Sequence, residues 1–439
     1  MQRRDFWYDE YGLKNMKKRV VITGLGVVAP NGVGLDAFQH AIKNGISGIK
    51  HFEELEKLKF SCQIAGMPEV STELALHYFT ELELKNFNSS GVLYGVIAGI
   101  DAWKDAGLPI ETLDEPDWDS GTIFGTGSSG IEKLRESIYK IDDFKVRNLG
   151  STSVLQTMNS GVSAYLGGKL GLGNQVSSNS SACTTGTESI IMAYDRIQSG
   201  QAKRILAGST SDSGPYIWGG FDAMRVCTFK HNDSPEIGSR PMSESASGFV
   251  PASGAGALVL EDLDTALARG ARIYAEVLGG SINSGGQRGL GSLTAPNPIA
   301  VQRCIEQAMT NSGITRQEVD AINGHLTATT KDSLEISNWS AALKRSGDNF
   351  PYINSLKSTV GHCLSAAGSI ESVATVLQLH QGFIFPNRNC EDLHPEIKAI
   401  IDPSCVPLQL IEEDINIIIK ASFGFGDVNG CVVLKKMIY

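Results

Sequence analysis

Residues 183–201 read CTTGTESIIMAYDRIQSGQ, and the strand-like segment RILAGST (204–210) follows them. The second half of the chain contains a similar arrangement, in which HCLSAAGSIESVATVLQLHQG (362–382) precedes the apolar segment IIIKASFGFG (417–426). In both places small residues lead into a helical pattern, and a strand rich in small residues comes later. About 180 residues separate the two copies, so the sequence predicts an internal duplication.

Short apolar segments alternate with longer helical patterns along the whole chain. They are rich in Val, Ile and Gly, as in VVITGLGVV (20–28), GTIFGTG (121–127) and GALVLE (256–261). This alternation predicts an α/β protein with largely buried sheets. At 439 residues the chain exceeds what one core usually supports. We expect two halves. Residues 16–267 contain Cys183, and residues 268–439 contain His325, Lys357 and His362, which are discussed below.

The composition limits the functions that are possible. A net charge of −10 argues against a general binder of nucleic acid or membrane surfaces, which needs Lys and Arg in excess on one face. The eight cysteines form no CxxC pair, which favours a reduced compartment over a disulfide framework or a zinc site.

Signal-peptide and membrane-span patterns are missing from the sequence, so we expect a cytoplasmic protein. Residues 1–15 precede MKKRVVITG, which looks like a natural start, and are expected to be an extension outside the fold.

Cys183 is the first candidate for chemistry. It lies in NSSACTTGTES, where small residues surround a thiol at a predicted strand-to-helix junction. The N–H groups and dipole of a helix N-terminus stabilise a thiolate, and small neighbours let a carbonyl approach. The alternative is a buried thiol in the core.

His325 and His362 each follow a predicted strand or turn among small and hydroxyl residues, in INGHLTATTKDSLE and SLKSTVGHCLSAAG. Such a setting can direct an imidazole into a cleft, where it stabilises an enolate or oxyanion. Lys357 lies five residues before His362, and its apolar left flank favours burial. Phe423 and Phe425 lie among glycines in ASFGFGDVNG, as core residues or as a mobile aromatic gate. A histidine taken alone is more often a structural residue than a catalytic one.

Together these segments resemble the β-ketoacyl-acyl carrier protein synthase family, and most of all its stand-alone elongating type. The resemblance runs from about Val20 to the C-terminus and includes VVITGLGVVAPNGVG, SSACTTGTES, GAGALVLE, NGHLTATTKDSLE, SLKSTVGHCLSAAGSIE and SFGFGDVNG. It implies a thiolase-like fold, in which a duplicated α/β unit gives five layers, α-β-α-β-α. It also implies a homodimer or a heterodimer with a related subunit, and an acyl carrier protein as partner.

The resemblance also implies roles for the candidate residues. Cys183 resembles the nucleophile that accepts the acyl group, and His325 and His362 resemble the pair that binds the malonyl thioester. Lys357 and Glu335 resemble the residues that support this pair. The N–H groups of Cys183 and Phe425 would form the oxyanion hole, with Phe423 and Phe425 as gate. The reaction is a decarboxylative Claisen condensation without metal or organic cofactor, because loss of CO2 supplies the carbanion.

Several residues depart from the family pattern. Leu326 follows the first histidine where the family has Gly, and the spacing to Glu335 is one residue short. Ser253 replaces an acidic residue before GAG, and Asp427 replaces a Gly in the last loop. These departures indicate a divergent branch, in fatty acid synthesis or in a specialised polyene or polyketide pathway.

Two other functions compete with condensation. One is a non-catalytic chain-length subunit, but such subunits lack the cysteine that is present here. The other is a coenzyme A thiolase, which would need a second reactive cysteine near the C-terminus, and Cys431 lies in a predicted strand instead.

The resemblance suggests two further sites. Ser129 in GTGSSG (125–130) aligns with a position in the acyl pocket that is often bulky, so a small residue there predicts longer or stiffer chains. The alternative is that Ser129 only packs a turn. Lys145, Arg147 and Arg225 flank the expected entrance as candidates for docking an acidic carrier protein, although each could be ordinary solvated charge.

Overall fold

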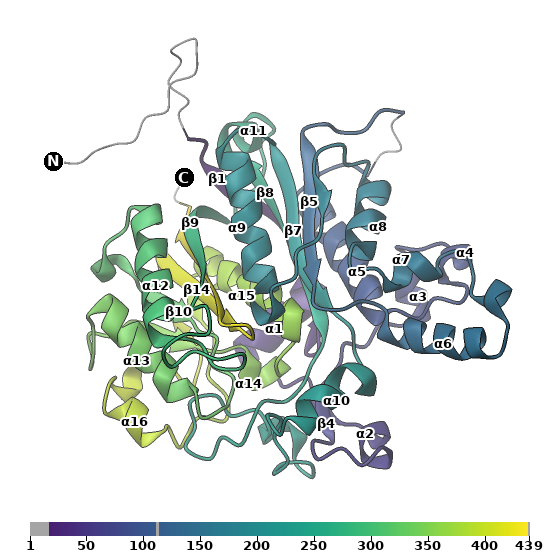
Figure 1. Cartoon of the computed structure of the whole chain (residues 1–439). Coiled ribbons are helices and arrows are strands. Elements are labelled where there is room, and N and C mark those ends of the chain that lie inside the picture. Colours follow the sequence, from purple (N-terminus) through teal and green to yellow (C-terminus); the bar gives the residue numbers. More distant parts are fainter. Residues whose placement is uncertain (1–16, 111–113, 438–439) are drawn as a thin grey trace.

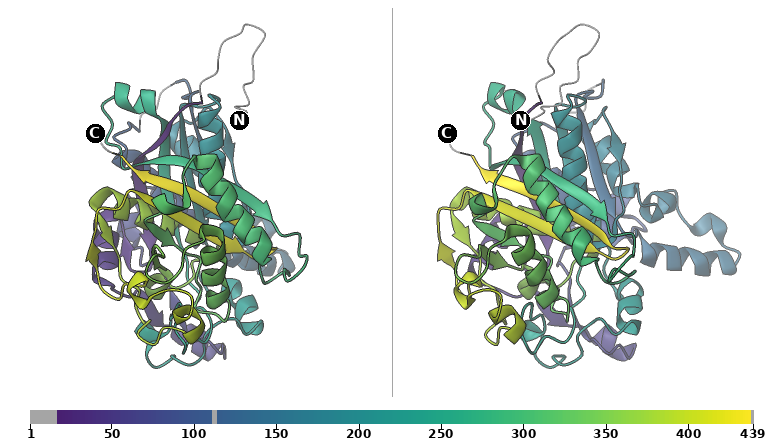
Figure 2. Two further views of the ribbon diagram at one scale, coloured as in Figure 1. Left: turned by 90° about the vertical axis from the view of Figure 1, so that its left-hand side faces the viewer. Right: turned by 60° about the vertical axis from the view of Figure 1, so that its left-hand side comes forward.

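The computed structural model describes residues 17–110 and 114–437 (Figure 1). The expected N-terminal extension, residues 1–15, lies outside the described residues. Helices cover a mixed sheet in which the strands of the two halves form two groups. Figure 2 shows the C-terminal strands, in green and yellow, lying in front of the N-terminal ones.

The first half contributes strands that pair in the order β1, β8, β7, β5, β6. Both β1 and β7 run antiparallel to β8, whereas β5 runs parallel to β7 and to β6. Every residue of β1 is buried, as expected for an almost continuous apolar strand covered on both faces. The bounds are β1 Val20–Ala29, β8 Gly254–Asp262, β7 Arg204–Ser211, β5 Ser120–Thr126 and β6 Val176–Ser177.

The second half repeats this order and these directions with β9, β15, β14, β10 and β11. The start of β9 pairs antiparallel with the start of β1, which joins the two groups. The duplication predicted from the sequence is therefore present in the topology. The bounds are β9 Ala275–Ser284, β15 Val428–Lys436, β14 Ile417–Gly424, β10 Ala321–Asn323 and β11 Tyr352–Asn354. The expected boundary between residues 267 and 268 falls in α11 (Leu263–Ala268), which connects the two groups, and stays a prediction.

Two helices, α9 (Thr185–Gln198) and α15 (Ala367–Gln381), lie between the two groups of strands and contact both of them. Residues of α15 are buried all round, as an apolar helix in the centre of a large core must be. The outer layers are formed by α5 (Ser90–Asp105) with α8 (Gly161–Leu170) and by α12 (Pro298–Ser312) with α13 (Asp332–Leu343). The five predicted layers are confirmed.

The two central helices approach closely at glycines. A Cβ on Gly186 would lie 2.3 Å from the backbone nitrogen of Ser369, and one on Gly368 would lie 2.6 Å from that of Thr187. Since both contacts are with backbone, any larger residue would push the helices apart. This crossing brings the segments before α9 and α15 to one place.

Further helices and short strands complete the fold, and among them α14 is completely buried. Within residues 17–110 and 114–437, no helix combines the length and the apolar character that a membrane span needs. Figure 1 shows α6 projecting from the side of the molecule. The bounds are β2 Gly32–Val33, α1 Leu35–Asn44, β3 Ile49–His51, α2 Glu53–Lys57, β4 Ile64–Gly66, α3 Thr72–Ala75, α4 Glu81–Leu84, α6 Ile131–Asp142, α7 Ser153–Thr157, α10 Pro215–Ala223, α14 Lys357–Val360, β12 Phe383–Ile384, α16 Pro395–Lys398 and β13 Ile411–Glu412.

Candidate active site

Cys183 lies in the short 3-10 helix η2 (Ala182–Thr184), which leads into α9. It is half-buried, whereas the other cysteines of the described chain are buried. Burial raises the pKa of the thiol to about 11, although the charge of Lys357 and a backbone hydrogen bond from Phe425 lower it in part. We expected the helix N-terminus to favour a thiolate. That expectation is wrong at neutral pH, because loss of water around the sulfur outweighs the nearby positive charge.

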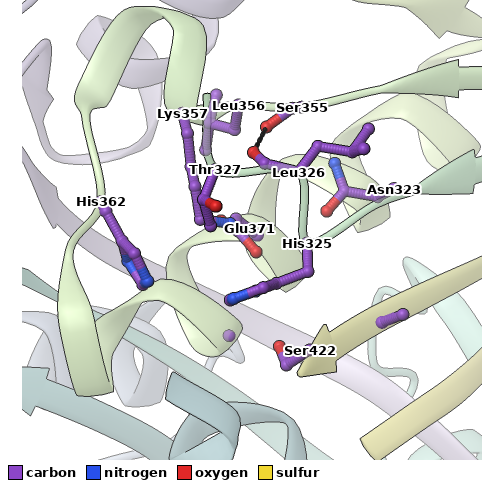
Figure 3. A network of polar contacts seen from close by, with 12 residues as sticks. Asn323, His325, Leu326, Thr327, Ser355, Leu356, Lys357, His362, Glu371 and Ser422 are labelled. Atoms are coloured by element: carbon purple, nitrogen blue, oxygen red, sulfur yellow. Dashed lines mark hydrogen bonds and ion pairs between the residues drawn. The ribbon is translucent and has the colours of Figure 1, made fainter. Parts of the chain in front are cut away.

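His325 and His362 converge on Cys183. The Cys183 sulfur and one nitrogen of each imidazole lie within 4.8 Å of one another, and the two imidazole centroids are 5.4 Å apart. His325 follows the end of β10, and His362 follows α14 after a turn at Gly361 with a φ of +73°. Figure 3 shows both rings directed into the same space. Three segments far apart in the sequence therefore meet where the two central helices begin.

Hydrogen bonding fixes the tautomer of His362. The backbone N–H of Leu364 donates to Nδ1, so the proton of the neutral ring is on Nε2. Burial, followed by the charges of Lys357 and Lys420, lowers the pKa of His362 well below its ordinary value. Burial and Lys357 lower the pKa of His325 in the same way. Both imidazoles are therefore neutral at pH 7, and His362 presents an Nε2–H donor.

Glu335 and Asp332, at the start of α13, hold the loop that carries His325. The two oxygens of Glu335 accept the backbone N–H groups of His325 and Leu326 at 2.7 and 2.8 Å. Asp332 accepts those of Thr327 and of the next residue at 2.9 and 3.0 Å. Burial raises the pKa of Glu335 to about 7, and the neighbouring Asp332 adds to the rise. Glu335 thus contacts the His325 backbone despite the shortened spacing, and Asp332 is a residue that sequence reasoning left unassigned.

A buried charge cluster lies behind the two imidazoles. Lys357, at the start of α14, pairs with Glu371 of α15, and Lys420 of β14 pairs with the second oxygen of the same carboxylate at 2.7 Å. All three side chains are almost fully buried. Sequence reasoning found Lys357 but missed the other two. A single carboxylate in the apolar helix SIESVATV and a single lysine in the apolar strand IIIKASF were the available signals.

Aromatic rings and a loop complete a cavity of about 250 Å³ around Cys183. Phe423 lies with its ring centroid 6.2 Å from that of His325, and Phe249, which sequence reasoning missed, lies 5.2 Å from that of His362. The ring of Phe425 is 6.1 Å from that of Phe221. Residues from both halves of the chain line this cavity, so neither half contains the site by itself.

Comparison with known proteins agrees with this geometry. The family model described as "Beta-ketoacyl synthase, N-terminal domain" matches residues 17–266. The model described as "Beta-ketoacyl synthase, C-terminal domain" matches residues 274–391. The chain belongs to the β-ketoacyl synthase family.

Relatives cover nearly the whole synthase. The chloroplastic 3-oxoacyl-[acyl-carrier-protein] synthase I of Arabidopsis thaliana is 32% identical over 95% of this chain and 87% of its own length. The 3-oxoacyl-[acyl-carrier-protein] synthase 2 of Vibrio harveyi is 33% identical over 96% of this chain and 99% of its own length. The predicted condensing activity is confirmed, and the synthase is an acyltransferase.

Solved structures agree equally well. A type II polyketide ketosynthase in complex with its acyl-carrier protein is 28% identical and has a TM-score of 0.84. The match covers 96% of this chain and all of that one. The ishigamide ketosynthase/chain length factor is 25% identical with a TM-score of 0.84 over 96% of this chain and all of that one. The predicted thiolase-like fold is confirmed.

Two of the departures from the family pattern are accommodated in the core. Leu326 is fully buried, and its carbonyl accepts a hydrogen bond from the hydroxyl of Ser355 at 2.9 Å, as Figure 3 shows. Ser253 is also fully buried, and its backbone N–H donates to the carbonyl of Gly66 at 2.9 Å. An uncharged side chain at this position avoids the cost of a buried charge.

Asp427, the third departure, connects two loops of the synthase. It is fully buried with a φ of +62°. Its carboxylate accepts the backbone N–H groups of Asn297 and Gln287 at 2.7 and 2.9 Å. The loop between these two residues contributes Thr294 to the cavity. Asp427 therefore ties that loop to the segment that contains Phe425.

The remaining predicted residues lie elsewhere. Ser129 is buried, its hydroxyl donates to the carbonyl of Gln156 at 3.2 Å, and it is not among the residues that line the cavity. Lys145 pairs with Asp143 after the end of α6, and Arg147 is exposed next to it. Arg225 is exposed immediately before Val226, which lines the cavity. The acyl-pocket role of Ser129 and the docking roles stay predictions.

The three converging residues include the ligand types that bind soft divalent metals. In the described part of the chain, Cys183, His325 and His362 are the group close enough to hold an ion. The buried charges of Lys357 and Lys420 act on both histidines and oppose the binding of a metal cation there.

Proposed function

We propose that Cys183 carries the acyl chain and that His325 and His362 bind the malonyl thioester with which this chain is condensed. The observation that carries the proposal is the convergence of one half-buried thiol and two neutral imidazoles within 4.8 Å. Acyl carrier protein is the proposed bearer of both substrates, and its support is that the relatives are named 3-oxoacyl-[acyl-carrier-protein] synthases.

The first half-reaction is a thioester exchange. The Cys183 sulfur attacks the carbonyl carbon of the incoming acyl thioester, a new C–S bond forms, and the bond to the carrier thiol breaks. The proton of Cys183 ends on the departing thiol. Backbone N–H groups of Cys183 and Phe425, which already hydrogen-bond to the sulfur, are placed to stabilise the oxyanion.

The second half-reaction is decarboxylative. The malonyl thioester oxygen accepts hydrogen bonds from the two imidazoles, including Nε2–H of His362, while the bond to the carboxylate breaks and CO2 leaves. The enolate carbon then attacks the carbonyl of the acylated Cys183, so that a C–C bond forms and the C–S bond to Cys183 breaks. The β-ketoacyl thioester departs on the carrier protein, and the released cysteine thiolate takes a proton from water.

The rival functions are less consistent with the site. A chain-length subunit does not need a thiol beside two neutral imidazoles. A thiolase needs a second cysteine in the cavity, and Cys431 is fully buried in β15 on the face that packs against α12.

Intact-mass spectrometry tests the proposal. The synthase is incubated with acyl-carrier proteins of different chain length and unsaturation, and then with malonyl-carrier protein. We expect an acyl adduct on the wild type and none on Cys183→Ala, followed by loss of the adduct and appearance of a ketoacyl-carrier protein. An adduct that persists with malonyl-carrier protein present would refute the proposal.

Carrier-protein docking is proposed at Arg225. Its support is its exposure next to Val226 at the cavity. Arg225→Glu should raise KM for carrier protein at low salt, since attraction to an acidic partner becomes repulsion. Lys203→Glu is the control, because Lys203 is also exposed and pairs with Asp119. An unchanged KM would remove Arg225 from the docking surface.

We also propose pairing with a second copy or a related subunit. Its support is an exposed apolar surface on and after α6, together with the short edge strand β6. The chain-length-factor complex among the similar structures favours the heterodimer. The exposed residues are Leu134, Ile138, Tyr139, Ile141, Phe144, Val146, Val154 and Leu155. Light scattering on Phe144→Lys should show weakened association if this surface is the interface.

The cytoplasmic location stays a prediction, since the relatives' names include chloroplastic and mitochondrial proteins.

A further inference from the structure

Lys420 is a lysine in the middle of the apolar strand β14. Its side chain is fully buried, and Nζ lies 2.7 Å from Oε2 of Glu371 and 3.0 Å from the hydroxyl of Ser422. Nζ also donates to the carbonyl of Ala421. Strand alternation places Ile418, Lys420 and Ser422 on one face of the strand. Because Glu371 belongs to α15, this face is the one directed at the central helices.

The cluster that contains Lys420 does not balance its charges. Glu371 is the carboxylate shared by Lys357 and Lys420, and the three side chains are 2%, 1% and 0% exposed. With all three ionised, the cluster carries one excess positive charge. Such a charge opposes folding, and an apolar residue at position 420 would avoid the cost. An unbalanced charge that costs stability within a native core is expected at a functional site.

The groups around Lys420 come from every element packed against it. Burial lowers the pKa of Lys420, whereas Glu371 and Glu335 raise it. In turn, the charge of Lys420 contributes to lowering the pKa of His325 and of His362. The titratable groups that interact with Lys420 are Lys357 of α14, Glu371 of α15, Glu335 of α13, Cys431 of β15, His325 and His362.

We propose that Lys420 is a positioning residue for the decarboxylative half-reaction. Together with Lys357 it places an excess positive charge behind His325 and His362, which adds to the effect of burial in keeping both imidazoles uncharged as hydrogen-bond donors and favours the negative charge of the enolate. The enolate part rests on the proposed function. The effect on the imidazoles is a property of the folded chain and needs no substrate.

The test removes the charge in two ways. Lys420→Met keeps the length of the side chain, and Lys420→Gln keeps a polar contact to Ser422 and Glu371. Lys133→Met is the matched control, because Lys133 is 1% exposed and pairs with Glu136 on α6. NMR of histidine-labelled protein gives the imidazole pKa values. Malonyl-carrier protein decarboxylation gives kcat and KM across pH.

We expect both Lys420 variants to raise the pKa of His325 and His362 by about one unit, as loss of a nearby like charge should. The acid limb of kcat should move to higher pH by a similar amount, so that decarboxylation at a pH on this limb becomes about tenfold slower while KM changes little. Lys133→Met should leave the histidine pKa values and the pH profile as in the wild type.

Unchanged histidine pKa values in a folded Lys420 variant would overturn the inference. If neither variant folds, the wild type decides, since a wild-type His325 or His362 that titrates near its ordinary pKa would overturn it equally. A shift of the histidine pKa values without condensation by the wild type would refute the proposed function and the enolate part of the inference, and would leave the effect of Lys420 on the two imidazoles standing.

Discussion

The backbone N–H of Leu364 donates to Nδ1 of His362 at 3.1 Å, and this contact makes Nε2 the protonated nitrogen. Leu364 is the first residue of η5 (Leu364–Ala366), with a φ of +51°, and Ala182 opens η2 with a φ of +50°. Both loops thus reach a central helix through a left-handed residue that carries a side chain. This conformation is costly and persists where the surrounding structure holds it.

Replacement of His362 should separate the two half-reactions. His362→Ala removes the Nε2–H donor, so condensation should fall by about 10² or more while self-acylation of Cys183 is partly retained. His325→Ala should behave in the same way. Intact-mass acylation and single-turnover decarboxylation measure the two steps. Equal loss of both steps in both variants would contradict the division of roles.

Cys183 should be the cysteine that iodoacetamide labels first. Accessibility is the reason, because the other seven cysteines are buried. With the pKa of Cys183 at about 11, the labelling rate should continue to rise above pH 8 without reaching a plateau. Peptide mass spectrometry after timed labelling gives the order. Equal or faster labelling of Cys62 or Cys227 would show that this prediction is wrong.

Glu335→Gln should impair the position of His325. Its amide nitrogen cannot accept the backbone N–H of His325 or Leu326, so one donor loses its partner at a cost of about 1–3 kcal/mol. We expect a lower kcat with a lower melting temperature. Trp339→Phe is the comparison variant, because it removes the longer 3.3 Å bond from the indole to Glu335 and leaves both backbone contacts of Glu335 in place. Since Trp339 is fully buried, this variant should lower the melting temperature through a core cavity and change kcat little. Normal decarboxylation by Glu335→Gln would show that this contact does not position the histidine.

Asp427→Gly should loosen the loop that spans residues 287–297. It removes both hydrogen bonds from the loop to the carboxylate, worth about 1.5–3 kcal/mol each when the acceptor is charged, and relieves the strain of a positive φ. Hydrogen exchange should become faster in this loop, and much less so in α9. Unaltered exchange would mean that other contacts hold the loop.

The neutral histidines should make the fold less stable in acid. Below the ordinary pKa of about 6.5, the histidines of the unfolded chain take up protons, whereas buried His325 and His362 do not. Their contribution to the free energy of unfolding therefore decreases as the pH is lowered. Glu335 acts in the opposite direction, since its pKa of about 7 lets the folded state bind a proton first. His362→Gln should therefore lose less stability than the wild type between pH 7 and 5.5. Denaturant titrations at both pH values measure the difference, and an equal loss would contradict it.

The sequence by itself determined the duplicated α/β fold and the identity of Cys183, His325, His362 and Lys357. Strand and helix periodicity, together with small residues before each central helix, are local properties of the chain. Motifs that stay in order along the chain could therefore be recognised without coordinates.

Only the tertiary structure decided the charge state of the site and the partners of its residues. Burial is a property of the assembled core, so the neutral thiol of Cys183 could not be derived from its helix position alone. The link between Glu371 and Lys420 joins a helix to a strand of the second half, and Asp427 reaches a loop more than a hundred residues away. Such contacts follow from how the layers pack, which no local pattern records.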